Sequence, residues 1–145
     1  MCLDTFQKKP KTAHKNITVY KVLEKSYYSD DVVKYRAPFQ PIFPNAIYKE
    51  TFYYYEPGKV HKPVRKHEEK YYWSSIDKNS KIKEVGDGWL HAFLFKTSAE
   101  LMAADRNRYY YHNCVVVQMT IPKGARYYES IGGFEICSDT LVWNE

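Results

Sequence analysis

A basic segment followed by aromatic residues has the residue types of an anion-binding site. Residues 59–70 carry seven Lys, Arg or His side chains, and residues 71–73 are Tyr-Tyr-Trp. Cations neutralise phosphate and aromatic rings stack on bases, which is how proteins hold single strands and nucleotides. We predict an exposed loop here, with ligand-binding residues Arg65, Lys66, Tyr72 and Trp73; a solvated loop without a ligand is the alternative.

A histidine inside an apolar segment is the second candidate. His91 lies in the stretch Gly88-Trp89-Leu90-His91-Ala92-Phe93. A histidine in such a place can orient a ligand or act as a base. The alternative is a core or rim histidine whose ring is satisfied by the backbone.

Catalytic and metal-binding patterns have little support. No Ser or Cys stands in the sequence context of an activated nucleophile. His61 and His67 are six residues apart, and His112 is close to Cys114, but neither spacing resembles a zinc pattern. We therefore expect no catalytic residues, no metal site and no cofactor, and we lean towards a protein that is not an enzyme.

Composition indicates one globular domain with a basic body. The chain has 145 residues, 44% of them hydrophobic and 27% charged, which is close to the globular average. Residues 1–126 hold all 22 Lys and Arg and 13 of the 17 acids, a net +9, whereas the tail after Arg126 carries −4. A basic body favours an anionic partner.

The 15 tyrosines suit half-buried strands, pockets and interfaces. Tyrosines facing outward from residues 53–55 and 109–111 allow a homo-oligomer contact.

Cysteine use and hydropathy indicate the compartment. The cysteines are Cys2, Cys114 and Cys137, an odd number with no C-x-x-C spacing, which favours free thiols in a reducing environment. The first fifteen residues contain no apolar core of a signal peptide, and no stretch approaches 18 apolar residues. We expect a soluble, cytoplasmic protein with no membrane association.

Periodicity predicts an α+β fold, a mostly antiparallel, twisted sheet with one main helix packed on it. Residues 1–16 read as a basic N-terminal arm, and residues 17–145 as a single domain. The helix is predicted at about 98–109, opened by a capping box from Thr97 to Glu100. Runs rich in β-branched and aromatic residues predict the strands, and Pro or Gly clusters the turns between them; the main predicted strands are 17–23, 47–55, 89–95, 114–121, 126–130, 134–137 and 140–143.

Several short segments form a recognisable set. These are the Met1-Cys2-Leu3 start, the strand Ile17-Thr18-Val19-Tyr20-Lys21-Val22-Leu23, the GWLHAF segment at 88–93 and the Ile121-Pro122-Lys123-Gly124 turn. Together they resemble short uncharacterised proteins encoded by gut Bacteroidales and their phages. The resemblance covers about a third of the chain. It implies a phage or mobile-element setting in the cytoplasm of a bacterial host, without an activity or functional residues.

A looser likeness is to the ADP-ribosyltransferase-like fold. In that fold a first-strand Tyr-Arg, a Ser-Thr-Ser strand and a Glu-x-Glu turn bind NAD, and here Tyr20-Lys21 and Ser74-Ser75 are similar to the first two. The likeness implies that Tyr20 and Lys21 bind a ligand. Lys21 replaces the arginine and lacks its bidentate phosphate contact, and no Glu-x-Glu occurs in the chain.

These observations lead to three hypotheses about function. The first is a non-enzymatic, phage-type binding protein that holds an anionic ligand, such as a nucleotide signal, or a host protein, for instance as an antagonist of host defence. The second is a virion structural or assembly protein. The third is an NAD-dependent ADP-ribosyltransferase-like enzyme with a degenerate motif. Nucleic acid is a further, weakly supported partner.

Overall fold

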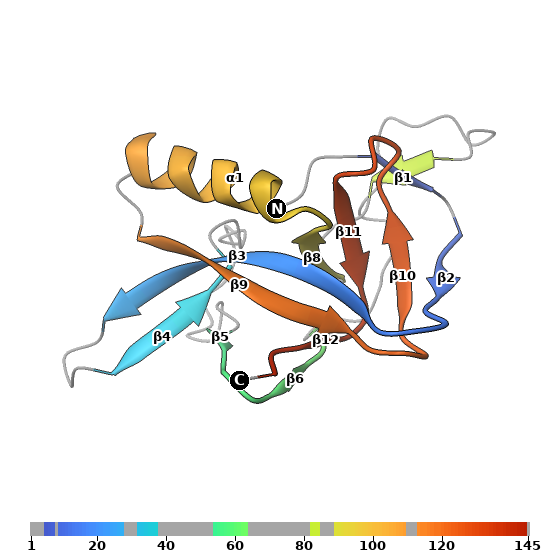
Figure 1. Ribbon diagram of the computed structural model, residues 1–145, viewed down its shortest axis with the longest axis horizontal. Coiled ribbons are helices and arrows are strands. Elements are labelled where there is room, and N and C mark those ends of the chain that lie inside the picture. Colours follow the sequence, from blue (N-terminus) through green and yellow to red (C-terminus); the bar gives the residue numbers. More distant parts are fainter. Residues whose placement is uncertain are drawn as a thin grey trace, which may run out of the picture.

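The computed structural model describes residues 5–7, 9–27, 32–37, 54–63, 82–84, 89–109 and 113–144. These residues form one helix and twelve strands (Figure 1). The elements in chain order are β1 (Thr5–Gln7), β2 (Lys11–Thr12), β3 (Ile17–Tyr27), β4 (Val33–Arg36), β5 (Tyr54–Tyr55), β6 (Val60–His61), β7 (Ile82–Glu84), β8 (Leu90–Phe93), α1 (Lys96–Tyr109), β9 (Cys114–Ile121), β10 (Arg126–Glu129), β11 (Glu135–Ser138) and β12 (Leu141–Val142).

Strand β3 is the centre of the main sheet. It pairs antiparallel with β9 over eight residues, from Ile17 opposite Ile121 to Glu24 opposite Cys114. Its other edge is shared between β8, which pairs at Tyr20, and β4, which pairs from Glu24 onwards. Residues 17–23 carry apolar side chains on both faces, which predicts an interior strand, and the pairing on both edges of β3 confirms it.

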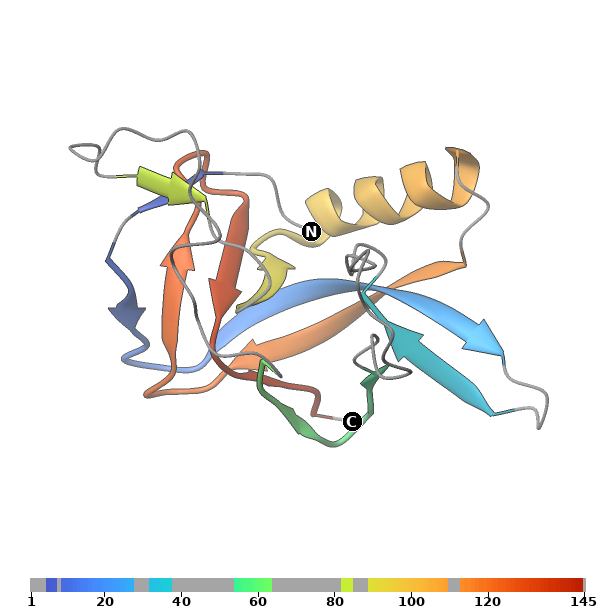
Figure 2. The same cartoon turned by 180° about the vertical axis from the view of Figure 1, so that it is seen from behind.

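The sheet curls back on itself. Its order is β2-β10-β11-β8-β3-β9-β12-β6, so β2 and β3 lie four pairings apart although only residues 13–16 separate them in the chain. Because β2 and β3 are nearly continuous, the strands between them must bend round to meet both. Figures 1 and 2 show β10 and β11 turned away from the direction of β3 and β9.

The two faces of β3 pack against different layers. Val19 and Leu23 point into the main core, which lies inside the curl and includes Met119, Ile121 and Ile136. Val22 points to the opposite face, where α1 covers β3 and β9 (Figure 1) and contributes Ala99 and Ala103. The mostly antiparallel sheet with one helix agrees with the predicted α+β class, with the sheet as the larger part.

Helix α1 begins earlier than predicted. The capping box places Thr97 before the helix, but α1 starts at Lys96 and Thr97 lies within its first turn. The Ala99 amide donates to the Phe95 carbonyl at 3.3 Å, and Lys96 and Glu100 form an i, i+4 ion pair at 3.9 Å. The helix ends at Tyr109 as expected, with Arg106 and Arg108 in its last turn.

Two other expectations change in the structure. The basic arm at 1–16 includes β2, which pairs with β10, and Ala13, which is only 2% exposed. The predicted exposed loop at 59–70 is wrong at its start, because Val60–His61 pair with β12 and His61 is 3% exposed. The rest of that segment from residue 64 lies outside the described residues, as does most of the strand predicted at 47–55.

Two glycine turns lie where the sequence predicts them. The Glu56-Pro57-Gly58 turn is present, with Gly58 at φ 76°, and Gly124 turns the chain between β9 and β10 at φ 93°. Cys114 and Cys137 are buried thiols that are not in a disulfide bond. No helix in the described part of the chain is long and apolar enough to cross a membrane.

Candidate functional site

Lys21 is a buried lysine at the middle of β3. Its side chain is 6% exposed, because strand alternation places it on the same face as Val19 and Leu23. The ammonium group donates to the backbone carbonyl of His91 and lies 5.3 Å from the centroid of the Tyr55 ring. A buried cation needs such partners, so the interior of the protein itself satisfies this group.

An aromatic pair continues this buried cluster. The Tyr55 and His61 rings lie 4.8 Å apart, centroid to centroid. The Nε2 atom of His61 is 3.3 Å from the Glu56 amide nitrogen and 3.1 Å from the Glu56 carbonyl oxygen. His61 therefore closes the turn between β5 and β6, and these contacts give it a structural role next to the Lys21 cation.

The structure separates some of the predicted site residues and joins others. Lys21 and His91 meet through the His91 carbonyl, whereas the neighbouring Tyr20 points to the other face of β3 and packs against the cluster under α1. Arg65, Lys66, Tyr72 and Trp73 lie outside the described residues. Sequence reasoning missed Tyr55 as a partner of Lys21, and the only signal was the alternation that turns Lys21 towards the core.

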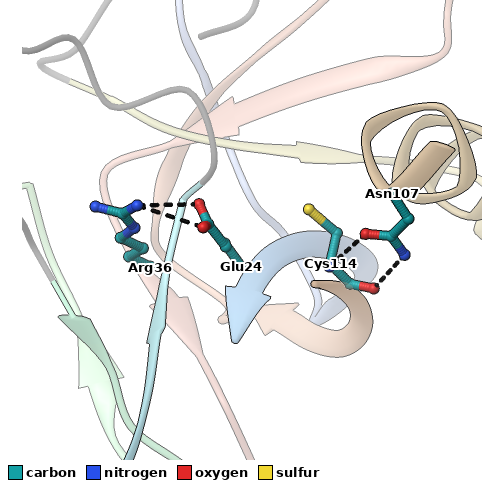
Figure 3. Close-up of polar contacts among 4 residues, drawn as sticks. All are labelled: Glu24, Arg36, Asn107 and Cys114. Carbon is teal, nitrogen blue, oxygen red and sulfur yellow. Dashed lines mark hydrogen bonds and ion pairs between the residues drawn. The ribbon is translucent and has the colours of Figure 1, made fainter. Parts of the chain in front are cut away.

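A polar network ties the far end of β3 to its neighbours (Figure 3). Arg36 Nη2 lies 3.3 Å from each carboxylate oxygen of Glu24, and both side chains are partly buried. Asn107 on α1 accepts from the Cys114 amide at 2.6 Å and donates to the Cys114 carbonyl at 3.1 Å. Because Glu24 and Cys114 are paired in the sheet, these two separate contacts together join β4, β3, β9 and the end of α1.

The chemistry of Cys114 is set by this surrounding. Burial, together with the negative charge of Glu24, raises the pKa of the Cys114 thiol from 9.0 to about 11, against a smaller lowering by Arg106. Since the thiolate is the reactive form, Cys114 is a poor nucleophile at neutral pH. Among the described residues, no group of three His, Cys, Asp or Glu side chains is placed to hold a metal ion.

The tertiary structure brings together a basic surface that no single sequence segment contains. Residues 9–16 and 122–126 carry five Lys and Arg and no Asp or Glu. The two segments are held side by side by backbone hydrogen bonds between Ala13 and Ala125 and between Gly124 and Ala13, both 2.8 Å. We call this surface the basic corner; its cations, all exposed, are Lys9, Lys11, Lys15, Lys123 and Arg126.

Two carboxylates lie beside the basic corner, Glu129 and Asp139, and Asp139 Oδ1 accepts a hydrogen bond from the Arg126 amide at 3.2 Å. Lys11 forms an ion pair with Glu129 at 3.4 Å, and both side chains are about half exposed. Such a surface pair is worth little. Within the described part of the chain, the side chains of the other four cations form no ion pair. Figures 1 and 2 show the connections β2–β3 and β9–β10 running together at one end of the molecule.

Comparison with known proteins found no match: no family model, curated protein or solved structure is similar to this chain.

Proposed function

We propose that this protein is a non-enzymatic binding protein that holds an anionic partner at the basic corner. The observation that carries the proposal is the pairing of residues 9–16 with 122–126, which gathers five exposed cations. Of these five, Lys11 is ion-paired with Glu129. A local excess of one charge raises the concentration of the opposite charge nearby and speeds association. The phage setting implied by the sequence resemblance is compatible with such a binder.

The buried groups support binding rather than catalysis. The Lys21 ammonium is held by the His91 carbonyl and the Tyr55 ring, away from solvent. The two described thiols are buried, and the pKa of Cys114 is raised to about 11. These groups are therefore poorly placed to attack a substrate. The exposed cations of the basic corner, by contrast, are accessible to an anionic ligand.

A calorimetric screen of the intact protein tests the proposal. The panel contains mono-, di- and cyclic nucleotides, a short oligonucleotide and poly-glutamate. We expect at least one anion to bind, and the double substitution Lys15→Glu with Lys123→Glu to weaken that binding at least tenfold.

The matched control is Lys59→Glu with Lys62→Glu. Both lysines are exposed and lie around β6, outside the basic corner, and the change in net charge is the same. Loss of binding in the corner variant alone supports the proposal. Silence of the whole panel, or equal losses in both variants, would overturn it.

A further inference from the structure

We infer that the anion held at the basic corner is the phosphodiester backbone of a nucleic acid, bound without sequence preference. This inference rests on the proposed function and names the partner of the same site. Three features support it: the length of the charged surface, its lysine side chains and the absence of an exposed apolar anchor in the described segments 9–16 and 122–126.

The charges are spread over a length that suits a chain of phosphates. Residues 9 to 13 include β2 and span at most about 13 Å at the rise of a strand. A nucleic-acid strand in a duplex presents one phosphate for about every 3.4 Å of axis, so this length faces roughly four phosphates. Of the five cations, only Lys9 and Lys11 lie within this stretch, and Lys15, Lys123 and Arg126 add charge beside it. A single nucleotide would engage only part of this set.

The side chains favour phosphate over base recognition. Four of the five cations are lysines, which act as point charges on flexible stems rather than as planar forks. Tyr127, which directly follows residues 122–126 in the chain, is half-buried and packs against the main core. Its ring is therefore poorly placed to stack on a base, and stacking or base-edge contacts would be needed for sequence preference.

In the described segments 9–16 and 122–126, the basic corner presents no exposed apolar or aromatic side chain of the kind that anchors a protein interface. Stable protein contacts are centred on buried apolar or aromatic anchors. Here the apolar residues Ala13 and Ala125 are buried within the protein, at 2% and 7% exposure, and the nearby Lys15 and Lys123 are exposed. A surface of exposed lysines without an anchor is better matched to a polyanion than to an acidic protein.

Fluorescence anisotropy with labelled single-stranded and double-stranded oligonucleotides of mixed sequence tests the inference. Between about 50 and about 200 mM salt, we expect log K to fall against log[salt] with a slope of about −3 to −4, because four or five cations each displace close to one counterion. The substitutions Lys15→Glu and Lys123→Glu should reduce the magnitude of that slope by about 1.5 and weaken binding at least tenfold. Two unrelated sequences should bind within a factor of about three.

Three results would overturn the inference. The first is binding of poly-glutamate or a free nucleotide at the basic corner without binding of either oligonucleotide, which leaves the proposed function standing. The second is oligonucleotide binding that the Lys59→Glu, Lys62→Glu protein loses equally. The third is silence of every anion, which removes the proposed function as well. Relative affinity for the two oligonucleotides shows whether single or double strands are the source of the phosphates, and thermal melting of each variant checks that it is folded.

Discussion

At the scale of the residue, Cys114 shows how one position depends on its neighbours in space. It starts β9 directly opposite Glu24, and Glu24 is in turn bound by Arg36 (Figure 3). Burial and the Glu24 charge both oppose the thiolate, so the pKa of the thiol rises from 9.0 to about 11. The folded protein therefore favours the neutral thiol more strongly than the unfolded chain does.

This shift makes stability depend on alkaline pH. Since the folded pKa is the higher one, its stabilising contribution is complete below pH 9 and is lost as pH rises from 9 towards 11. We expect the difference in free energy of unfolding between wild type and Cys114→Ala to fall by about 1–2 kcal/mol over that range. Urea denaturation at several pH values measures it, and subtraction removes the other titrating groups. A difference that stays constant with pH would contradict the prediction.

For Lys21, the local sequence indicates which face of the strand the side chain occupies but not which groups it contacts. Its place in a β-branched strand indicates the face it occupies, and its side chain is buried as that alternation requires. Its partners, the His91 carbonyl and the Tyr55 ring, lie 70 and 34 positions away in the chain. No local pattern around Lys21 identifies them.

At the scale of the element, α1 is attached to the sheet by small residues on one side and by Asn107 at its end. Ala99 and Ala103 allow close packing on β3 and β9. Asn107 satisfies both the amide and the carbonyl of Cys114, at 2.6 and 3.1 Å. These two bonds connect the last turn of α1 to the first residue of β9.

Removal of this connection should destabilise the protein. Asn107→Ala leaves the amide and the carbonyl of the buried Cys114 without these partners, so we expect a loss of about 1–3 kcal/mol in the free energy of unfolding. Asp105→Ala is the matched control, because Asp105 is exposed on the same helix; we expect a change of about 0.5 kcal/mol or less. Chemical denaturation compares the two, and equal stabilities would show that the Asn107 bonds contribute nothing.

At the scale of the whole molecule, the curl of the sheet joins segments more than a hundred residues apart. Ala13 is buried, and its amide and carbonyl bond to Ala125 and Gly124 across the seam between the two segments. The same seam carries the ion pair between Lys11 and Glu129 of the acidic tail. The basic corner therefore exists only when β2 has paired with β10.

The part of residues 1–16 around Ala13 should consequently matter for stability. Ala13→Asp places a carboxylate in the core, and we expect a loss of about 3 kcal/mol or more. Lys15→Asp, two residues further on, makes a similar change at an exposed position and should cost little. Thermal melting distinguishes them; a wild-type melting temperature for Ala13→Asp would mean that this segment is dispensable for the fold.

The amino-acid sequence by itself determined the features that depend on a few neighbouring residues. The bounds of β9 and the last residue of α1 agree with the prediction, and the turns at Gly58 and Gly124 lie where expected, because alternation, helix propensity and turn chemistry are local properties. Tertiary structure alone decided that His61 is buried, that Lys21 meets Tyr55 and the His91 carbonyl, and that residues 9–16 meet 122–126. Such contacts arise from the pairing of strands far apart in the chain, and that pairing is set by the burial of the whole core at once rather than by any one segment.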